Sequence, residues 1–402
     1  MTETPVLPDG FRAAGVHCGL KDGDALDLGL ILADEAMPAF ALFTQNELLG
    51  AHVVVCQRHL AQSGGKVRAV LVNSANANCA TGEQGEKDNK AVCRALAMLL
   101  VCPQNEILFM STGVIGARLD VDKVVAALPG LKEAVRRDGV TEFAEAIMTT
   151  DTKPKISTGS LTATDGETVQ VCGIAKGSGM IHPDMATMLA FLVTDGRSQA
   201  DLGIGLRALA NRSFHCVTVD GDTSPNDTVL LWTAQRHWCR PVKDEHDMGT
   251  VHPLEEELTR VSRELSRMIA ADGEGATRMI TLQIEGAMSE GDALDGGRFI
   301  ATSPLVKTAV FGRDPNWGRI LSAAASSGMP INMENVGIRI GEFVLYSEGT
   351  SHPENEAAAK AYMEENEEIV IGVNFGMGPF EAELWTCDLT DSYVRINADY
   401  RT

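Results

Sequence analysis

Thr187 occupies a position where cleavage of the chain could create a hydroxyl nucleophile. Pro183 fixes a turn a few residues earlier, and the apolar run Met188–Val193 that follows favours a buried strand. A threonine between a rigid turn and a strand can attack the preceding carbonyl, that of Ala186, and shift the acyl group from nitrogen to oxygen. Hydrolysis of that ester would leave Thr187 as a new N-terminus.

A free N-terminal threonine carries both a nucleophile and a base. The α-amine has an unperturbed pKa of about 7.7–8.0, so it can accept the hydroxyl proton near neutral pH. Threonine with its own amine is a known nucleophile–base pair. Taken alone, the residues around Thr187 favour a simpler reading, in which it merely begins a strand.

Two neighbouring patterns could bind ions. The turn Lys176–Gly179 offers a positive charge and backbone N–H groups to an anion, but it matches no phosphate-binding loop. The stretch from Asp220 to Asn226 resembles the start of a calcium loop, yet Pro225 and Leu231 replace its required glycine and glutamate. We therefore expect a polar turn here and no metal site in the chain.

Composition narrows the class of protein. The net charge is −21 and no basic patch is present, which argues against nucleic-acid binding. The nine cysteines are odd in number and form no C-x-x-C pair, so we expect reduced thiols. Met1–Phe11 does not resemble a signal peptide, and apolar stretches such as Ala95–Val101 are too short to cross a bilayer. These features predict a cytoplasmic protein with no membrane partner.

The hydrophobic pattern predicts an α/β layered fold. At 402 residues the length suggests two or three domains, although single α/β folds reach this size. Helices are expected at Lys87–Val101, Asp201–Asn211, Pro253–Ala271 and after Trp317. Strands are expected at His52–Cys56, Val67–Val72, Ile107–Met110, Val169–Ile174, Met188–Val193, Thr228–Trp232, Met279–Ile284, Thr308–Phe311, Val336–Ile340 and Ile369–Phe375.

The chain closely resembles the glutamate N-acetyltransferase/ornithine acetyltransferase family of arginine biosynthesis. Lys176–Leu192 is similar to the family's self-processing motif, and the resemblance extends over nearly the whole chain. Other matching segments are Val72–Asn78, Ser111–Gly116, Met148–Thr152, Asp220–Thr223, Asp272–Thr277, Gly312–Arg319 and Ile396–Thr402. So many ordered matches are far more specific than any single motif.

The resemblance implies a fold and a processing event. The expected fold is an αββα-type sandwich of the self-processing N-terminal-nucleophile kind, with a smaller lobe on the C-terminal side. Self-cleavage between Ala186 and Thr187 would give an α chain of residues 1–186 and a β chain of residues 187–402. Two such pairs usually form a heterotetramer in this family.

The resemblance also implies roles for individual residues. Thr187 is the expected nucleophile, and Thr112 and Gly113 the expected oxyanion hole. The expected substrate contacts are Thr150, Lys176, Thr187, Glu274, Asn397 and Thr402. We pair Lys176 with a substrate carboxylate and Glu274 with the ammonium of ornithine. One departure is Asp184, where the family often has asparagine; a carboxylate there could change the rate of processing.

The implied activity is transfer of the acetyl group from N-acetyl-L-ornithine to L-glutamate through an acetyl-Thr187 ester. No metal or cofactor is expected; some family members also accept acetyl-CoA as donor, and the sequence leaves that choice open. Two alternatives stay open from the residues. A self-processing aminopeptidase or amidase would pass the acyl group to water, and a non-catalytic ligand-binding protein would keep an intact chain.

Overall fold

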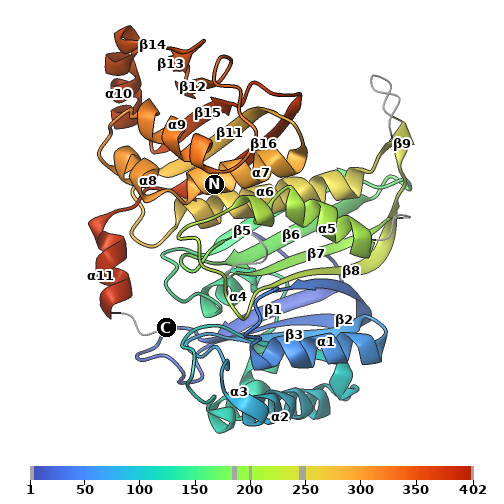
Figure 1. The fold of residues 1–402 in the computed structure, drawn as a ribbon. Coiled ribbons are helices and arrows are strands. Elements are labelled where there is room, and N and C mark those ends of the chain that lie inside the picture. Colours follow the sequence, from blue (N-terminus) through green and yellow to red (C-terminus); the bar gives the residue numbers. More distant parts are fainter. Residues whose placement is uncertain (1–3, 183–187, 199–201, 244–249, 400–402) are drawn as a thin grey trace.

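The structure is a computed structural model that describes residues 4–182, 188–198, 202–243 and 250–399 (Figure 1). The helices are α1 Ala51–Ser63, α2 Gly82–Leu100, α3 Val121–Ala134, α4 Val140–Ala146, α5 Leu202–Asn211, α6 Pro253–Ala271, α7 Glu290–Ala301, α8 Pro304–Phe311, α9 Trp317–Ser326, α10 Glu356–Glu365 and α11 Asp391–Asp399. The strands are β1 Phe11–Val16, β2 Leu28–Phe43, β3 Lys66–Asn73, β4 Ile107–Ser111, β5 Lys155–Thr162, β6 Thr168–Lys176, β7 Leu189–Ser198, β8 Thr228–Cys239, β9 Val242–Lys243, β10 Thr250–Val251, β11 Met279–Ala287, β12 Gly337–Ile340, β13 Phe343–Ser347, β14 Thr350–Ser351, β15 Glu368–Asn374 and β16 Phe380–Cys387.

The long strand β2 joins two layers of sheet. Its first part, Leu28–Leu32, pairs with β1 and β3, and its last part, Ala39–Phe43, pairs with β8. Within the described ranges this connects eight strands in the order β4-β3-β2-β8-β7-β6-β5, with β1 beside β2. Figure 1 shows the β1–β3 layer below the β5–β8 layer. A single hydrogen-bonded sheet therefore folds over on itself.

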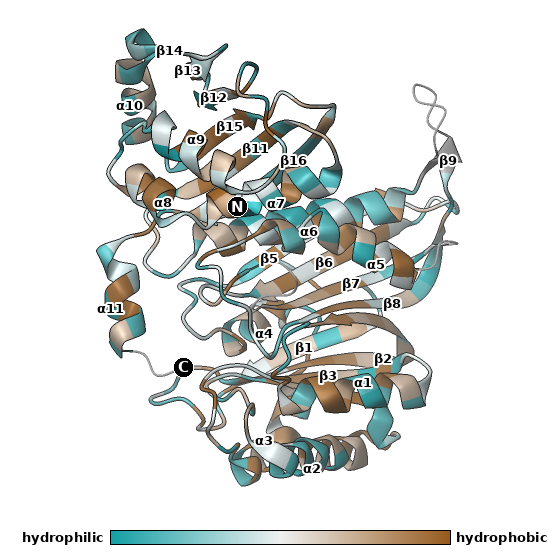
Figure 2. Cartoon of the chain, viewed as in Figure 1, coloured by the Kyte–Doolittle hydropathy of each residue, from teal (hydrophilic) through white to brown (hydrophobic). Residues whose placement is uncertain are grey.

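Alternation of side chains gives the central strands, such as β4 and β7, two buried faces. In β7, Leu189, Phe191 and Val193 point into the core between the two layers, whereas Ala190 and Leu192 point outward into a second core. This is the period of two expected of a strand covered on both sides. Figure 2 accordingly shows predominantly apolar residues along these strands.

Helices cover both outer faces of the two layers. α2 and α3 pack on the outer face of the β1–β4 layer, and α5 and α6 pack on the outer face of the β5–β8 layer. The order helix, sheet, sheet, helix confirms the predicted αββα sandwich. Of the helices in the described ranges, none combines the length and the apolar character needed to span a bilayer.

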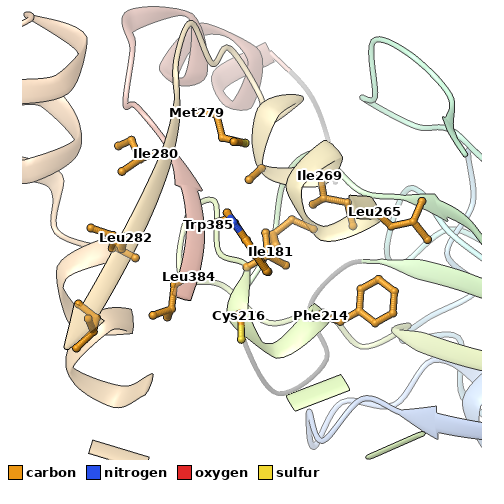
Figure 3. Close-up of a cluster of buried hydrophobic side chains, with 14 of the residues drawn as sticks. Ile181, Phe214, Cys216, Leu265, Ile269, Met279, Ile280, Leu282, Leu384 and Trp385 are labelled. Carbon is orange, nitrogen blue, oxygen red and sulfur yellow. The ribbon is translucent and has the colours of Figure 1, made fainter. Parts of the chain in front are cut away.

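A smaller lobe follows on the C-terminal side, as predicted. Within the described residues it is a six-stranded sheet of order β14-β13-β12-β15-β11-β16. Its core is continuous with that of the sandwich, because α6 lies between the two sheets. Figure 3 shows Leu282, Leu384 and Trp385 of this sheet in one cluster with Leu265 and Ile269 of α6.

Two expected strands are wrong. His52–Cys56 lies in α1. Its buried face includes His52, Val53, Cys56 and His59, and Gly64 caps the C-terminus of the helix. Short apolar runs fit either period, and burial along one helical face decides in favour of the helix.

Thr308–Phe311 likewise lies in α8. There Ser303 accepts a hydrogen bond from the Val306 N–H and Pro304 occupies the first turn, so the segment starts as a capped helix. The other expected strands overlap β3, β4, β6, β7, β8, β11, β12 and β15.

Candidate active site

A cavity of about 190 Å³ brings together residues that the sequence analysis selected separately. Its wall includes Thr112, Gly113, Thr150, Glu274 and Asn397. They come from the end of β4, the segment after α4, the loop after α6, and α11. The volume is below the roughly 300–1,000 Å³ of drug-sized pockets, so the cavity suits a small metabolite.

The turn after β4 leaves two hydrogen-bond donors for the cavity. The backbone N–H of Thr112 donates to the Asn73 carbonyl at 3.0 Å, so the hydroxyl is the hydrogen-bond donor that Thr112 has left for the cavity. The N–H of Gly113 donates to no other described residue. Gly113 has φ +130°, and a Cβ there would lie 2.3 Å from the Ala75 carbonyl carbon. Only glycine fits this close approach.

Lys176 lies behind the cavity wall. It ends β6, is only 2% exposed, and donates from Nζ to the hydroxyls of Thr112 at 3.2 Å and Thr149 at 2.8 Å. Burial lowers the pKa of Lys176, and the nearby carboxylate of Asp151 opposes that shift. Because the Thr112 oxygen accepts from Lys176, its own proton is left to donate into the cavity.

A buried group of charges lies next to Lys176. Asp151 accepts from Lys155 Nζ and from the Gly177 N–H, both at 2.7 Å, and Lys155 also contacts Asp272 at 2.5 Å. Burial raises the pKa of Asp151, but the positive charges of Lys176 and Lys155 outweigh it and bring the pKa to about 2. Asp151 therefore stays ionised, and the sequence analysis assigned it no role.

The last helix is tied to the cavity by polar contacts. Asn397 Nδ2 on α11 donates to Glu274 Oε2 at 2.8 Å, and the Tyr393 hydroxyl donates to Asp220 at 3.4 Å. A Cβ on Gly179 would lie 2.4 Å from the Glu274 carboxyl carbon, so the glycine makes room for this carboxylate. Asn397 therefore lines the cavity, and its expected contact with the substrate stays a prediction.

Asp220 also lines the cavity, beside α11. Its carboxylate accepts from the backbone N–H groups of Met180 at 2.6 Å and Ile181 at 2.9 Å. Burial raises the pKa of Asp220, and these N–H bonds only partly counteract that shift. The motif that resembled a calcium loop thus holds the backbone at Met180 and Ile181, directly after the Lys176–Gly179 turn, and places the carboxyl groups of Asp220 and Asp222 in the cavity wall.

Four selected residues lie outside the described ranges: Asp184, Ala186, Thr187 and Thr402. The nearest described neighbour of Thr187 is Met188, whose backbone N–H donates to Asp227 Oδ1 at 3.0 Å. Asp227 is fully buried, and burial raises its pKa well above the ordinary value. It follows Asn226, which lines the cavity, so β7 begins close to the site.

A model of the ArgJ family matches residues 12–402 of the chain. The chain belongs to the ArgJ family. It is 43% identical to the arginine biosynthesis bifunctional protein ArgJ of Parasynechococcus marenigrum, over 98% of this chain and 94% of that protein. It is 42% identical to the protein of the same name from Geobacillus kaustophilus, over 99% of this chain and 96% of that one.

Solved structures of relatives also match parts of the chain. The arginine biosynthesis bifunctional protein of Bacillus halodurans is 35% identical, with a TM-score of 0.46 over 52% of this chain and 98% of that one. The ornithine acetyltransferase of Mycobacterium tuberculosis, solved in complex with ornithine, is 39% identical, with a TM-score of 0.40 over 44% of this chain and 92% of that one.

Membership of the ArgJ family confirms the resemblance inferred from the sequence motifs. It also confirms the predicted enzyme, a glutamate N-acetyltransferase/ornithine acetyltransferase of arginine biosynthesis. The non-catalytic alternative and the hydrolase alternative gain no support from these relatives.

Proposed function

We propose that the enzyme transfers the acetyl group of N-acetyl-L-ornithine to L-glutamate through an ester on Thr187. Before catalysis the chain cuts its own Ala186–Thr187 bond. The observation that carries the proposal is the convergence of Thr112, Gly113, Glu274 and Asn397 on one small cavity, close to the start of β7.

The oxyanion hole consists of the Thr112 hydroxyl and the Gly113 N–H. Both are free to donate, since the Thr112 oxygen accepts from Lys176 and the Gly113 N–H has no partner in the described part of the chain. Removing one such donor typically costs about 10²–10³ in turnover, which is enough to matter for an acyl transfer.

The acyl transfer then balances without a cofactor. The Thr187 hydroxyl attacks the acetyl carbonyl while its proton passes to the α-amine of Thr187. The tetrahedral intermediate collapses, and the nitrogen of ornithine leaves with that proton. In the second half the neutral α-amine of glutamate attacks the acetyl ester, and one of its protons passes through the Thr187 amine to the leaving Thr187 oxygen, which regenerates the free hydroxyl. Acetyl-CoA could load the same ester, with its thiolate as leaving group.

Charge around the cavity suits an amino-acid substrate. Glu274, with Asp220 nearby, provides negative charge for the side-chain ammonium of ornithine, and Asn397 holds Glu274 in position. Lys176 provides positive charge for the α-carboxylate from behind Thr112 and Thr149. Thr150 and the C-terminal Thr402 complete the proposed contacts.

The two chains stay together after cleavage in this proposal. β7, which begins just after Thr187, pairs along Leu189–Thr194 with Val171–Lys176 of β6, and on its other side with β8. The new β chain is therefore part of the same sheet as the α chain. Two such pairs form the proposed heterotetramer.

Isotope tracing tests the transfer. With N-acetyl-L-ornithine labelled in the acetyl group and L-glutamate present, we expect each ornithine released to be matched by one labelled N-acetylglutamate. Without glutamate, we expect one ornithine per active site and then a stop. Continued release of labelled acetate without glutamate would instead identify a hydrolase.

A further inference from the structure

Asn226 connects three distant parts of the chain next to the cavity. The side chain is buried, with 4% exposure, and its Nδ2 donates to the Ala77 carbonyl at 2.6 Å and to the Ser111 carbonyl at 2.7 Å. Ser111 ends β4, directly before Thr112 and Gly113. The amide of Asn226 thus holds the backbone of the turn that carries the oxyanion donors.

The peptide group between Ser111 and Thr112 is held at both ends. The Ser111 N–H donates to Nδ1 of the buried His52 at 3.3 Å, the Ser111 carbonyl accepts from Asn226, and the Thr112 N–H donates to Asn73 at 3.0 Å. A peptide plane held at its C=O and its N–H cannot rotate freely. The N–H of Gly113 belongs to the next peptide group, so fixing the Ser111–Thr112 plane restricts the directions in which that N–H can point.

Packing alone does not explain an asparagine here. Its Oδ1 is buried and has no hydrogen-bond partner in the described residues. A Cβ on Gly50 would lie 2.1 Å from that oxygen, so the glycine makes room for the amide. An unpaired buried oxygen costs stability, and each such group calls for an explanation. The two donated bonds are what the residue contributes.

We propose that Asn226 is a positioning residue for acetyl transfer. By holding the Ser111 carbonyl, it keeps the Gly113 N–H and the Thr112 hydroxyl aligned with the oxygen of the reacting carbonyl. This role rests on the acetyl-Thr187 chemistry proposed above. It differs from substrate binding, because the bonds of the Asn226 side chain go to backbone carbonyls.

The rate of acylation tests this role. In Asn226→Ala, we expect single-turnover release of ornithine from cleaved enzyme to slow about 10–100-fold, with the KM for N-acetylornithine little changed. Asn89→Ala is the matched control, since Asn89 is equally buried and donates to the Phe109 carbonyl, two residues before Ser111 on the same strand. Its rate per active site should stay close to that of the wild type.

An infrared measurement separates positioning from general destabilisation. In the wild-type acetyl-enzyme, made with a ¹³C-labelled carbonyl, hydrogen bonds from the turn should lower the ester carbonyl frequency below that of a free ester. Asn226→Ala should return the band towards the free-ester position, and Asn89→Ala should not. Should the alanine variant fail to fold, Asn226→Asp fills the same space with at most one donor and should show an intermediate shift.

The outcomes are distinguishable. A folded Asn226→Ala enzyme with the wild-type rate and band would overturn the positioning role and leave the proposed function intact. A wild-type enzyme that forms no acetyl ester on Thr187 would overturn the proposed function, and this inference with it.

Discussion

The chemistry at the cavity depends on which donors the fold leaves unused. The backbone N–H of Thr112 donates to Asn73, so the hydroxyl, which accepts from Lys176, is the donor that the proposed oxyanion hole uses. The second proposed donor is the N–H of Gly113, at a position whose backbone conformation tolerates no side chain. The charge of Lys176 is in turn maintained by Asp151, whose pKa of about 2 keeps it ionised. A few buried residues therefore set the electrostatics of the site.

His52, which supports the same turn, predicts a pH dependence of stability. Burial lowers its pKa from 6.5 to about 4, so between these values the unfolded state binds the proton and the folded state does not. His52 therefore does not lower the unfolding free energy above pH 6.5, and the unfolding free energy falls as the pH drops below that value. By pH 5 the loss from His52 is about 2 kcal/mol. His52→Asn keeps an acceptor for Ser111 but cannot titrate.

Denaturant unfolding between pH 8 and pH 5 measures this effect. We expect the unfolding free energy of His52→Asn to fall by about 2 kcal/mol less than that of the wild type over this range. At pH 8 histidine is neutral in both the folded and the unfolded state. The difference in unfolding free energy between the two proteins at that pH is therefore the effect of the substitution apart from titration. Parallel pH curves for the two proteins would contradict the assignment.

The sequence predicted part of the site. Thr112, Gly113, Thr150, Glu274 and Asn397 were selected by the family resemblance, and the structure places all five around one cavity. The supporting residues were missed. His52 was assigned to a strand, and Asp151 and Asn226 were given no role, because their partners are brought close only by the folded chain.

At the scale of elements, α11 is attached by polar contacts. None of its residues is buried in the described part of the helix, and the bonds from Asn397 to Glu274 and from Tyr393 to Asp220 hold it against the cavity. A helix that buries little apolar surface adds little to stability. Its contribution should therefore appear in catalysis.

Deleting residues 397–402 tests this view of the C-terminal segment. We expect kcat/KM for N-acetylornithine to fall at least about tenfold, since even one lost charge-assisted hydrogen bond is worth about 1.5–3 kcal/mol, while Tm changes by only a few degrees. Arg395→Ala is the control, because Arg395 is exposed on the same helix and pairs with Asp391. Unchanged kinetics after the deletion would refute the docking.

Elements with a strong periodic signal were predicted well. The amphipathic pattern placed α6 at Pro253–Ala271, the same bounds that the structure gives. Short apolar segments were less reliable, as α1 and α8 show, since four or five residues do not define a period. β1 and β2 were not expected at all. Their alanines and glycines carry little strand propensity, and pairing with β3 and β8 decides their conformation.

At the scale of the whole molecule, the fold explains how one chain could be cut and remain a single body. β7 lies between β6, which precedes the proposed cleavage point, and β8, which follows it. The core between the two layers also joins residues from both sides: Phe143 of α4 packs edge-on against Phe191 of β7, with ring centroids 5.4 Å apart. The division into chains 1–186 and 187–402 stays a prediction.

Mass and N-terminal sequence of the purified protein test the central claim most directly. The account predicts two fragments under denaturing conditions, one beginning Thr187-Met188-Leu189, that elute as one species under native conditions. Thr187→Ala should stay at the full 43.0 kDa, whereas Thr194→Ala, which changes a threonine within β7, should be cut normally. An intact wild-type chain that still transfers acetyl groups would contradict the assignment of Thr187 as a nucleophile freed by cleavage.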